Sequence, residues 1–361
     1  MDDFSDFVLR LTSTNDFAGF VQRALEQHEK LTGLSAPRHR LRDWKSPFER
    51  FGDDEFRSRY LFSKDAVLEL HKLLGLRTKS NRGCPVHPLH QLLITLRYFA
   101  SASFQAVAGD LENVSQASVS RCVATISRAV ANLRLRYVRL PESHEIPGVK
   151  EEFRALAGFP DVTGCVLSRH VHILNPGGEL SNMYLNEHGF CSINVQMTCG
   201  PKMQFYNIMA DSPGGIQASN VLEESDFGAL LTSGRYPGII LADSAYPCTD
   251  YLFTPLESPT TASEKRYNES HSKTYQVAQD TVGLWKRRFR CLSSRLSTKL
   301  HTSIAIVVAT AVLHNFALEK KEPLPELNES TDRTVLPEQQ TPPKSYSVEV
   351  AGRTEFIAQN F

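Results

Sequence analysis

VTGCVLSRHVHIL, residues Val162 to Leu174, is the stretch of sequence that decides the class of fold. It is rich in β-branched residues and alternates in character, as strands do. Three shorter stretches of the same kind follow it, and Gly- and Pro-rich turns separate them: Cys191–Thr198, Phe205–Ala210 and Ile239–Ala242. The centre of the chain therefore predicts a sheet.

Helical patterns lie on both sides of this centre, from Tyr60 to about Leu140 and from Lys273 to Phe316. Ser63 is the expected N-cap of the first of these helices, before the apolar run that starts at Ala66. The order of helices, strands and helices predicts a mixed α/β fold, in which helices flank a mixed sheet. We expect an N-terminal extension (1–55), a helical region (56–142), the sheet-containing domain (143–320) and a disordered linker with a short closing helix (321–361).

Composition excludes several classes of protein. Lys+Arg 40 balances Asp+Glu 40, so binding to nucleic acid has to come from local patches rather than from net charge. The chain has seven cysteines and no Cys-x-x-Cys pair, which favours a reducing compartment, the cytosol or the nucleus. The longest apolar run, from Ile304 to Leu313, is too short to span a bilayer and predicts a core helix.

A helix-turn-helix candidate lies before the sheet. A short helix from Phe104 to Leu111 and a turn lead to a longer helix, for which Ser115 is the expected N-cap. The polar side chains at its start are candidates for contact with DNA, and they are Gln116, Ser118 and Arg121. Val119, Val123 and Ile126 would pack inward. The same pattern also fits two ordinary helices of a bundle.

The densest positive patch of the chain follows the sheet. Four cationic residues surround Phe289 and follow Trp285, and they are Lys286, Arg287, Arg288 and Arg290. Such a patch can neutralise phosphates. The alternative is a solvated helix face with Trp285 in the core.

Several motifs in combination resemble those of the Harbinger transposase-derived nucleases, of the PIF/Harbinger superfamily. The resemblance covers roughly residues 55 to 320. It rests on segments that include Ser115–Val123, Gly189–Gln196, Asp243–Pro247, Arg288–Leu292 and Val312–Asn315. It implies an RNase H-like catalytic domain, an Asp, Asp, Glu triad and a divalent metal cofactor, Mg²⁺ or Mn²⁺.

Carried over residue by residue, the resemblance keeps only one catalytic acid. The family's first Asp precedes a His by three positions, and here His170 matches the His while Leu167 stands in the Asp position. Asp243 matches the second Asp. The Glu that follows the Tyr-Asn-x-x-His-Ser segment is replaced by Gln279. A further His-Asp pair of the family corresponds to Gln217 and Ala218.

The sequence leaves several functions open. The first is a catalytically impaired member that acts by binding DNA or a partner protein, and the resemblance implies a Myb/SANT-like DNA-binding partner and a location in nucleus and cytoplasm. The second is an active metal-dependent endonuclease with shifted ligands such as Asp280. Decay without a selected role and a weak Cys165–His170–His172 metal site are further alternatives.

Overall fold

The computed structural model describes residues 46–76, 86–104, 107, 114–325 and 351–361. The chain forms two compact units, one of residues up to Arg97 with Phe104–Cys122, and one of Tyr98–Ser103 with Val123–Phe361. The second unit holds the sheet and includes the stretch from Val123 to 142. The predicted helix at Phe17–Leu31, most of the predicted helix at 104–111 and most of the predicted linker at 322–343 lie outside the described residues.

The first unit is helical. Its described elements are α3 (Pro47–Arg50), α4 (Asp53–Tyr60), α5 (Lys64–Leu74), the start of α6 (Pro88–Ser101) and the first turns of α8 (Gln116–Ala131). Ser63 caps α5 as predicted, because its side chain accepts a hydrogen bond from the backbone N of Ala66 at 3.3 Å. The aromatic rings of Phe56 and Phe62 are fully buried in this unit.

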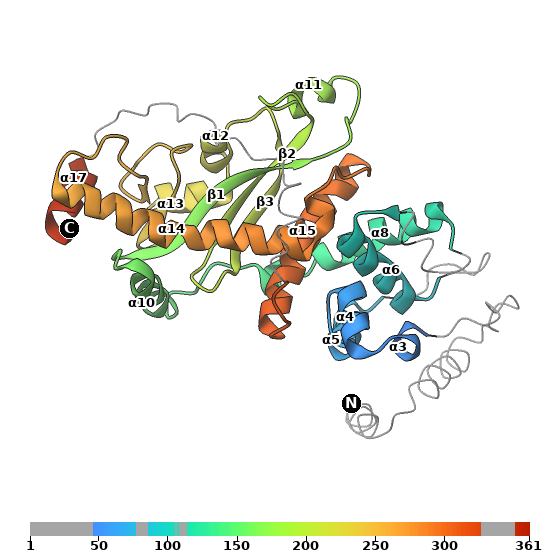
Figure 1. The fold of residues 1–361 in the computed structure, drawn as a ribbon. Helices are drawn as coiled ribbons and strands as arrows, with labels where there is room; N and C mark the ends of the chain where they lie inside the picture. Colours follow the sequence, from blue (N-terminus) through green and yellow to red (C-terminus); the bar gives the residue numbers. More distant parts are fainter. Residues whose placement is uncertain (1–45, 77–85, 105–106, 108–113, 326–350) are drawn as a thin grey trace, which may run out of the picture. The chain divides into compact units, whose positions relative to one another are not determined.

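The second unit is built on one five-stranded mixed sheet (Figure 1). Its strands are β1 (Val162–His172), β2 (Ser192–Cys199), β3 (Phe205–Pro213), β4 (Ile239–Leu241) and β5 (Leu252–Phe253). The spatial order is β3-β2-β1-β4-β5. β1, β2 and β3 pair antiparallel, while β4 and β5 run parallel to β1. The four predicted strands are confirmed, and the two-residue β5 was not predicted.

Helices cover both faces of the sheet. Val166 of β1 packs with residues of α12 (Ala218–Glu223) and α13 (Asp226–Thr232) on one face. On the other face, α14 (Ala262–Arg288) crosses in front of the strands, and α15 (Leu300–Glu319) packs against β3 (Figure 1). The remaining elements are α9 (Arg134–Tyr137), α10 (Ile146–Ala157), α11 (Leu180–Tyr184), the 3-10 helix η1 (Arg290–Leu292) and α17 (Ala351–Asn360). This is the mixed α/β architecture that the sequence predicts, and it is consistent with an RNase H-like fold.

The helix α14 begins earlier than the sequence suggested. We expected Tyr267–Ser272 to be a loop, but this segment is helical because α14 starts at Ala262. A capping box starts it: Thr261 accepts from the backbone N of Glu264, and the Glu264 carboxylate accepts from the backbone N of Thr261. The Thr-x-x-Glu spacing was the available signal for this start.

The helix α15 is long and apolar enough to cross a membrane by composition, but 78% of its most apolar window is buried inside the unit. Asn315 on this helix donates to the carbonyls of Tyr137 and Phe205 at 2.7 and 2.8 Å. The prediction of a core helix around Ile304–Leu313 is therefore confirmed.

Candidate active site

The strand register places Leu167 beside Asp243. Cys165 of β1 pairs with Leu241 of the parallel strand β4. Because parallel strands advance together, two further residues bring Leu167 and Asp243 alongside each other on the same face of the sheet. Leu167 is fully buried. The position where the family carries its first carboxylate is therefore filled by a side chain that offers no ligand.

Both carboxylate oxygens of Asp243 have partners within the chain. Oδ1 accepts a hydrogen bond from the backbone N of Ala245 at 3.1 Å, which closes a turn after β4. Oδ2 lies 3.2 Å from the hydroxyl of Tyr275. Burial, together with the negative charge of Asp243, holds the pKa of Tyr275 well above its usual range, so this hydroxyl keeps its proton. It donates that proton to Asp243 or to the carbonyl of Val166, also at 3.2 Å.

A guanidinium supplies the positive charge beside Asp243. Arg169 Nη1 lies 3.8 Å from Asp243 Oδ2, and the side chains of Arg169 and Asp243 are 22% and 30% exposed. Arg169 comes two residues after Leu167, so both side chains leave β1 on the same face. Nη1 also donates to the carbonyl of Ser168 at 2.8 Å.

The third triad position comes from α14. Tyr275 contacts Asp243, and Gln279 follows it by four positions, which is a rotation of only about 40° around the helix. Gln279 is half-buried. The fold thus brings the three expected positions together around Asp243, with Leu167 and Gln279 in place of acids.

Asp280 does not replace the missing acid. It lies about 140° around α14 from Tyr275. Its side chain is exposed and accepts a hydrogen bond from Gln276 at 2.9 Å. The proposal of a shifted ligand at this position therefore has no geometric support.

The residues present do not fit a pair of divalent ions. Mg²⁺ and Mn²⁺ prefer several carboxylate oxygens, and this site offers one carboxylate that is already bonded to Ala245, Tyr275 and Arg169. Across the described residues no group of three His, Cys, Asp or Glu side chains is arranged to hold a metal ion.

The opposite face of β1 carries a polar network. His170 Nδ1 lies 3.0 Å from the hydroxyl of Ser192, and Asn186 donates to the same hydroxyl at 3.1 Å. Cys165 lies on the other face of this strand from His170 and His172, because it is separated from them by odd numbers of residues. The Cys165–His170–His172 metal site is therefore wrong.

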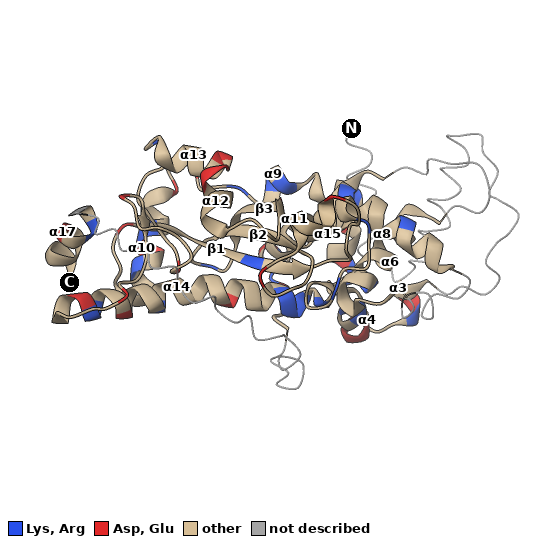
Figure 2. Cartoon of the chain, turned by 90° about the horizontal axis from the view of Figure 1, so that it is seen from above, with Lys and Arg blue, Asp and Glu red and all other residues tan. Residues whose placement is uncertain are grey.

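The predicted basic patch is only partly a surface. Figure 2 shows Lys and Arg gathered at the carboxyl-terminal end of α14. Arg290 is exposed, and Lys286 and Arg287 are half-buried. Arg288 is 4% exposed and donates to the carbonyl of Pro323 at 3.1 Å, so its prediction as a DNA contact is wrong. It falls on the inner side of the helix, where burial lowers its pKa to about 10.

The start of α8 agrees with the predicted helix entry. The side chain of Ser115 accepts from the backbone N of Ser118 at 3.2 Å. Gln116 and Arg121 are exposed, and Arg121 donates to the Ser118 hydroxyl at 3.1 Å. Val119, Val123 and Ile126 are fully buried, as expected. The polar side chains at this helix start are thus open to solvent.

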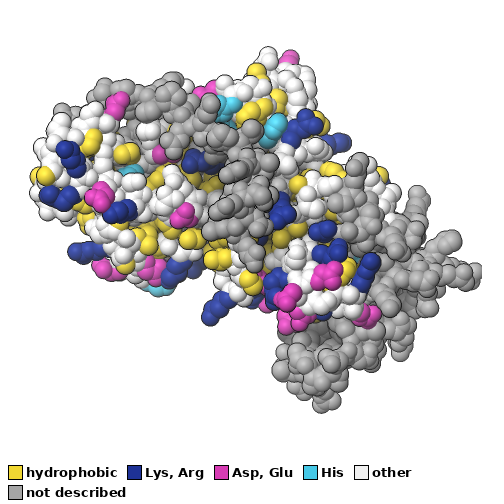
Figure 3. All heavy atoms as spheres, in the orientation of Figure 1, with side chains coloured by type: hydrophobic (Ala, Val, Ile, Leu, Met, Phe, Trp, Pro, Cys, Tyr) yellow, Lys and Arg dark blue, Asp and Glu magenta, His cyan; other side chains and the backbone are white. Residues whose placement is uncertain are grey.

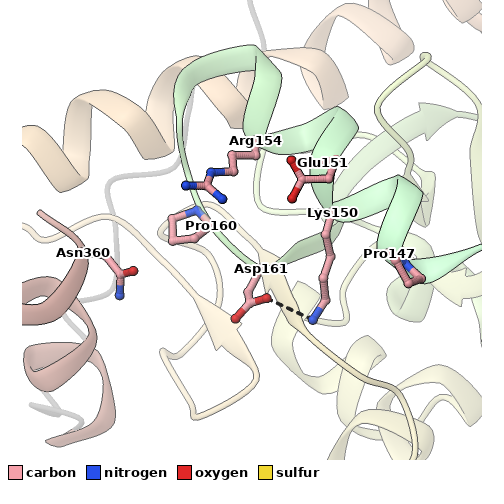
Figure 4. A pocket seen from close by; sticks show the side chains of 7 residues that line it. All are labelled: Pro147, Lys150, Glu151, Arg154, Pro160, Asp161 and Asn360. Carbon is pink, nitrogen blue, oxygen red and sulfur yellow. Dashed lines mark hydrogen bonds and ion pairs between the residues drawn. The ribbon is translucent and has the colours of Figure 1, made fainter.

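A cavity of about 430 Å³ lies away from this site, within the part of the chain that the structure describes. Residues of α10 and of the turn before β1 line it, together with Asn360 of α17 (Figure 4). Lys150 and Asp161 form an ion pair of 3.0 Å across it. None of the triad positions lines this cavity.

Two residues around Asp243 were missed by the sequence analysis, Arg169 and Tyr275. A charged residue in an otherwise apolar strand, two positions after Leu167, was the signal for Arg169. Tyr275 carried no comparable signal, because its role depends on how α14 packs against the sheet.

Comparison with known proteins shows the family of the chain. The family model described as "DDE superfamily endonuclease" matches residues 168–315. "Putative nuclease HARBI1" of Homo sapiens is 35% identical over 274 residues, which cover 74% of this chain and 78% of the human protein. The chain belongs to the Harbinger transposase-derived nuclease family.

The chain is also similar to proteins of other organisms. The Xenopus laevis protein of the same name is 32% identical over 80% of this chain and 84% of its own length. "Protein ALP1-like" of Arabidopsis thaliana is 23% identical over 67% of this chain and 63% of its own length. No solved structure matches the chain.

Proposed function

We propose that this Harbinger-family chain has lost two-metal phosphodiester cleavage and acts by binding DNA or a partner protein. One observation carries the proposal: the surviving acid, Asp243, is bonded within the chain while the buried Leu167 fills the neighbouring ligand position. Two-metal cleavage needs carboxylates that hold both ions in place. The family, not the site, supplies the expectation of a Mg²⁺ or Mn²⁺ cofactor.

DNA binding would use the cationic residues that remain accessible. In the sheet-containing unit these are Lys286, Arg287 and Arg290 at the end of α14. In the first unit the separate candidates are the cation Arg121 and the neutral polar residues Gln116 and Ser118 at the start of α8. Arg169 is close to the emptied site, but Asp243 offsets much of its charge. A Myb/SANT-like partner and a location in nucleus and cytoplasm remain part of this proposal, on the family resemblance.

Cleavage of supercoiled DNA tests the loss of catalysis. The full chain is incubated with Mg²⁺ or Mn²⁺ beside its Asp243→Asn and Asp280→Asn variants. We expect nicking no higher than that of Asp243→Asn. Metal-dependent nicking that disappears in Asp243→Asn contradicts the proposal, and loss in Asp280→Asn as well supports the shifted-ligand endonuclease.

A restoration variant sharpens this test. Leu167→Asp combined with Gln279→Glu returns both family acids to the positions that the fold places beside Asp243. Because like charges in one site repel until a cation joins them, we expect Mn²⁺ to raise the Tm of this variant and leave that of the wild type unchanged. An equal shift in both proteins contradicts the geometry described above.

Gel-shift assays at two salt concentrations test DNA binding. Replacing Arg287 and Arg290 by Ala should lower affinity and reduce the slope of log K against log salt by up to about 2, since each phosphate contact releases counterions. Lys202→Ala removes an exposed cation that does not belong to α14 and serves as the matched control. Unchanged affinity in the double variant rejects this surface as the contact.

A further inference from the structure

Exposed hydrophobic side chains gather around α11. In the described residues eight large hydrophobic side chains are exposed, and five of them belong to this region: Leu174, Leu180, Met183, Leu185 and Ile216. Figure 3 shows hydrophobic side chains over α11 with histidine side chains beside them. We call these five residues the α11 surface. Exposed apolar side chains that gather in one region of a folded protein mark an interaction site more often than single exposed residues do.

The fold holds this surface in place. The backbone N of Gly215 donates to the carbonyl of Met183 at 3.0 Å, which ties the loop that carries Ile216 to α11. Asn194 donates to the carbonyl of Ile216 at 2.7 Å. A Cβ at Gly214 would lie 2.2 Å from Ser192 Oγ and 2.8 Å from the carbonyl of Tyr184, so only glycine permits this close approach.

A second link joins the other end of the α11 surface. Asn175 Nδ2 donates to the hydroxyl of Ser181 at 2.8 Å, and Asn175 follows Leu174 directly. The patch therefore consists of side chains on a backbone that is already ordered. A partner that binds it would not have to order these segments first.

Acidic side chains lie at the two ends of α11, and Arg295 lies on the Leu174 side of the surface, because the backbone N of Leu174 donates to the carbonyl of its neighbour Leu296. Between His170 and Gly234 the chain has a single Lys or Arg, Lys202, which forms an ion pair with Glu152 of α10. The same segment carries three exposed acids next to α11 or near it: Glu179, Glu187 and Asp211. Asp211 lies near α11, since its charge contributes to the raised pKa of Tyr184. These three acids would repel phosphate groups and attract cationic side chains at the α11 end of the surface.

We propose that the α11 surface binds a basic amphipathic helix of a partner protein. The apolar face of such a helix would cover Leu180, Met183 and Ile216, and its Lys or Arg side chains would face the acids at the border. A second copy of this chain fits less well, because a symmetric contact centred on α11 would bring the acids of the two copies together. The inference deepens the partner-binding half of the proposed function and rests on it.

A synthetic peptide provides the probe. An 18-residue Leu–Lys amphipathic helix with a fluorescent label is titrated with the full chain and followed by anisotropy, beside a Leu–Glu helix of the same pattern. We expect the Leu–Lys helix to bind and the Leu–Glu helix to bind at least tenfold more weakly. Equal binding of both peptides, or no binding of either, overturns the proposal.

One substitution separates apolar from purely ionic binding. Met183→Glu adds a negative charge to the α11 surface while it removes an apolar contact. We expect at least a fivefold loss of affinity for the Leu–Lys helix. Leu156→Glu, which changes another exposed leucine on α10, should leave affinity within twofold of the wild type. Unchanged or tighter binding by Met183→Glu means that charge alone attracts the peptide, and it overturns the proposal.

Two further measurements identify the occupant. If the full chain dimerises in sedimentation experiments and Met183→Glu makes it monomeric, the surface binds a second copy and the proposal is wrong. In the second measurement, a peptide of the chain's own basic residues 37–45 competes with the Leu–Lys helix for the full chain. If this peptide displaces the helix, the occupant is that segment and the proposal is also wrong. DNA affinity and nicking by Met183→Glu should equal those of the wild type, so a failure here is distinguishable from a failure of the proposed function.

Discussion

The guanidinium of Arg169 and the hydroxyl of Tyr275 both contact the carboxylate of Asp243, and the buried Leu167 fills the neighbouring position, whereas five large apolar side chains around α11 face solvent. Both regions lie on the same sheet-containing unit, and both are built on ordered backbone. The difference indicates which of the two regions can still bind another molecule. The inherited catalytic position has its interactions satisfied within the chain, and the α11 surface has apolar area that only another molecule can cover.

The largest effect should come from placing the same charge in both regions. Leu167→Asp buries a second carboxylate beside Asp243, where the single guanidinium of Arg169 cannot balance both acids, and we expect a loss of about 3–5 kcal/mol in the free energy of unfolding. Leu180→Asp makes the same change on the α11 surface, where about 0.5 kcal/mol or less is expected. Denaturant unfolding of both variants measures this. Equal losses would show that the two regions do not differ in burial.

An effect of intermediate size is expected on the pH dependence of the free energy of unfolding. Burial lowers the pKa of His271 on α14 to about 4, below its value in the unfolded chain. The unfolded state therefore binds more protons between about pH 6.5 and 4, so stability is present above this window and is lost as the pH falls through it. We expect His271 to account for about 1–2 kcal/mol of the loss between pH 7 and 5.

Unfolding at several pH values measures this slope. His271→Gln should flatten it, because the substitution removes the titrating group. His314 of α15 contributes a similar slope, since burial lowers its pKa to about 4 too. A wild-type stability that does not change from pH 7 to 5 contradicts the buried, neutral state of both residues.

The smallest effect should come from the surviving acid itself. Asp243→Asn removes the ion pair with Arg169, but both side chains are partly exposed, so solvent screens the pair. We expect a loss below about 1 kcal/mol in the free energy of unfolding, and a smaller one at high salt. Asp280→Asn, an exposed acid on α14, is the control. A loss several times larger would mean that Asp243 has a stronger structural role than its geometry indicates.

Much of the fold was predictable from local patterns. Strand alternation located β1 to β4, and the serine caps located the starts of α5 and α8. The early start of α14 was missed, although its capping box was readable at Thr261 and Glu264. β5 was missed because two residues carry too little periodicity, and its pairing with β4 depends on the assembled sheet.

The sequence by itself determined which acids are absent, because Leu167 and Gln279 are identities that motif spacing reveals without coordinates. It also determined the order of the elements, since periodicity and caps act within a few residues. Only the tertiary structure decided that Arg169 and Tyr275 meet Asp243, that Asp280 faces solvent and that Arg288 is buried. These facts depend on strand register and on the rotation of α14, which contacts between distant residues establish. The α11 surface is likewise a tertiary feature, because its five residues come from three separate stretches of the chain.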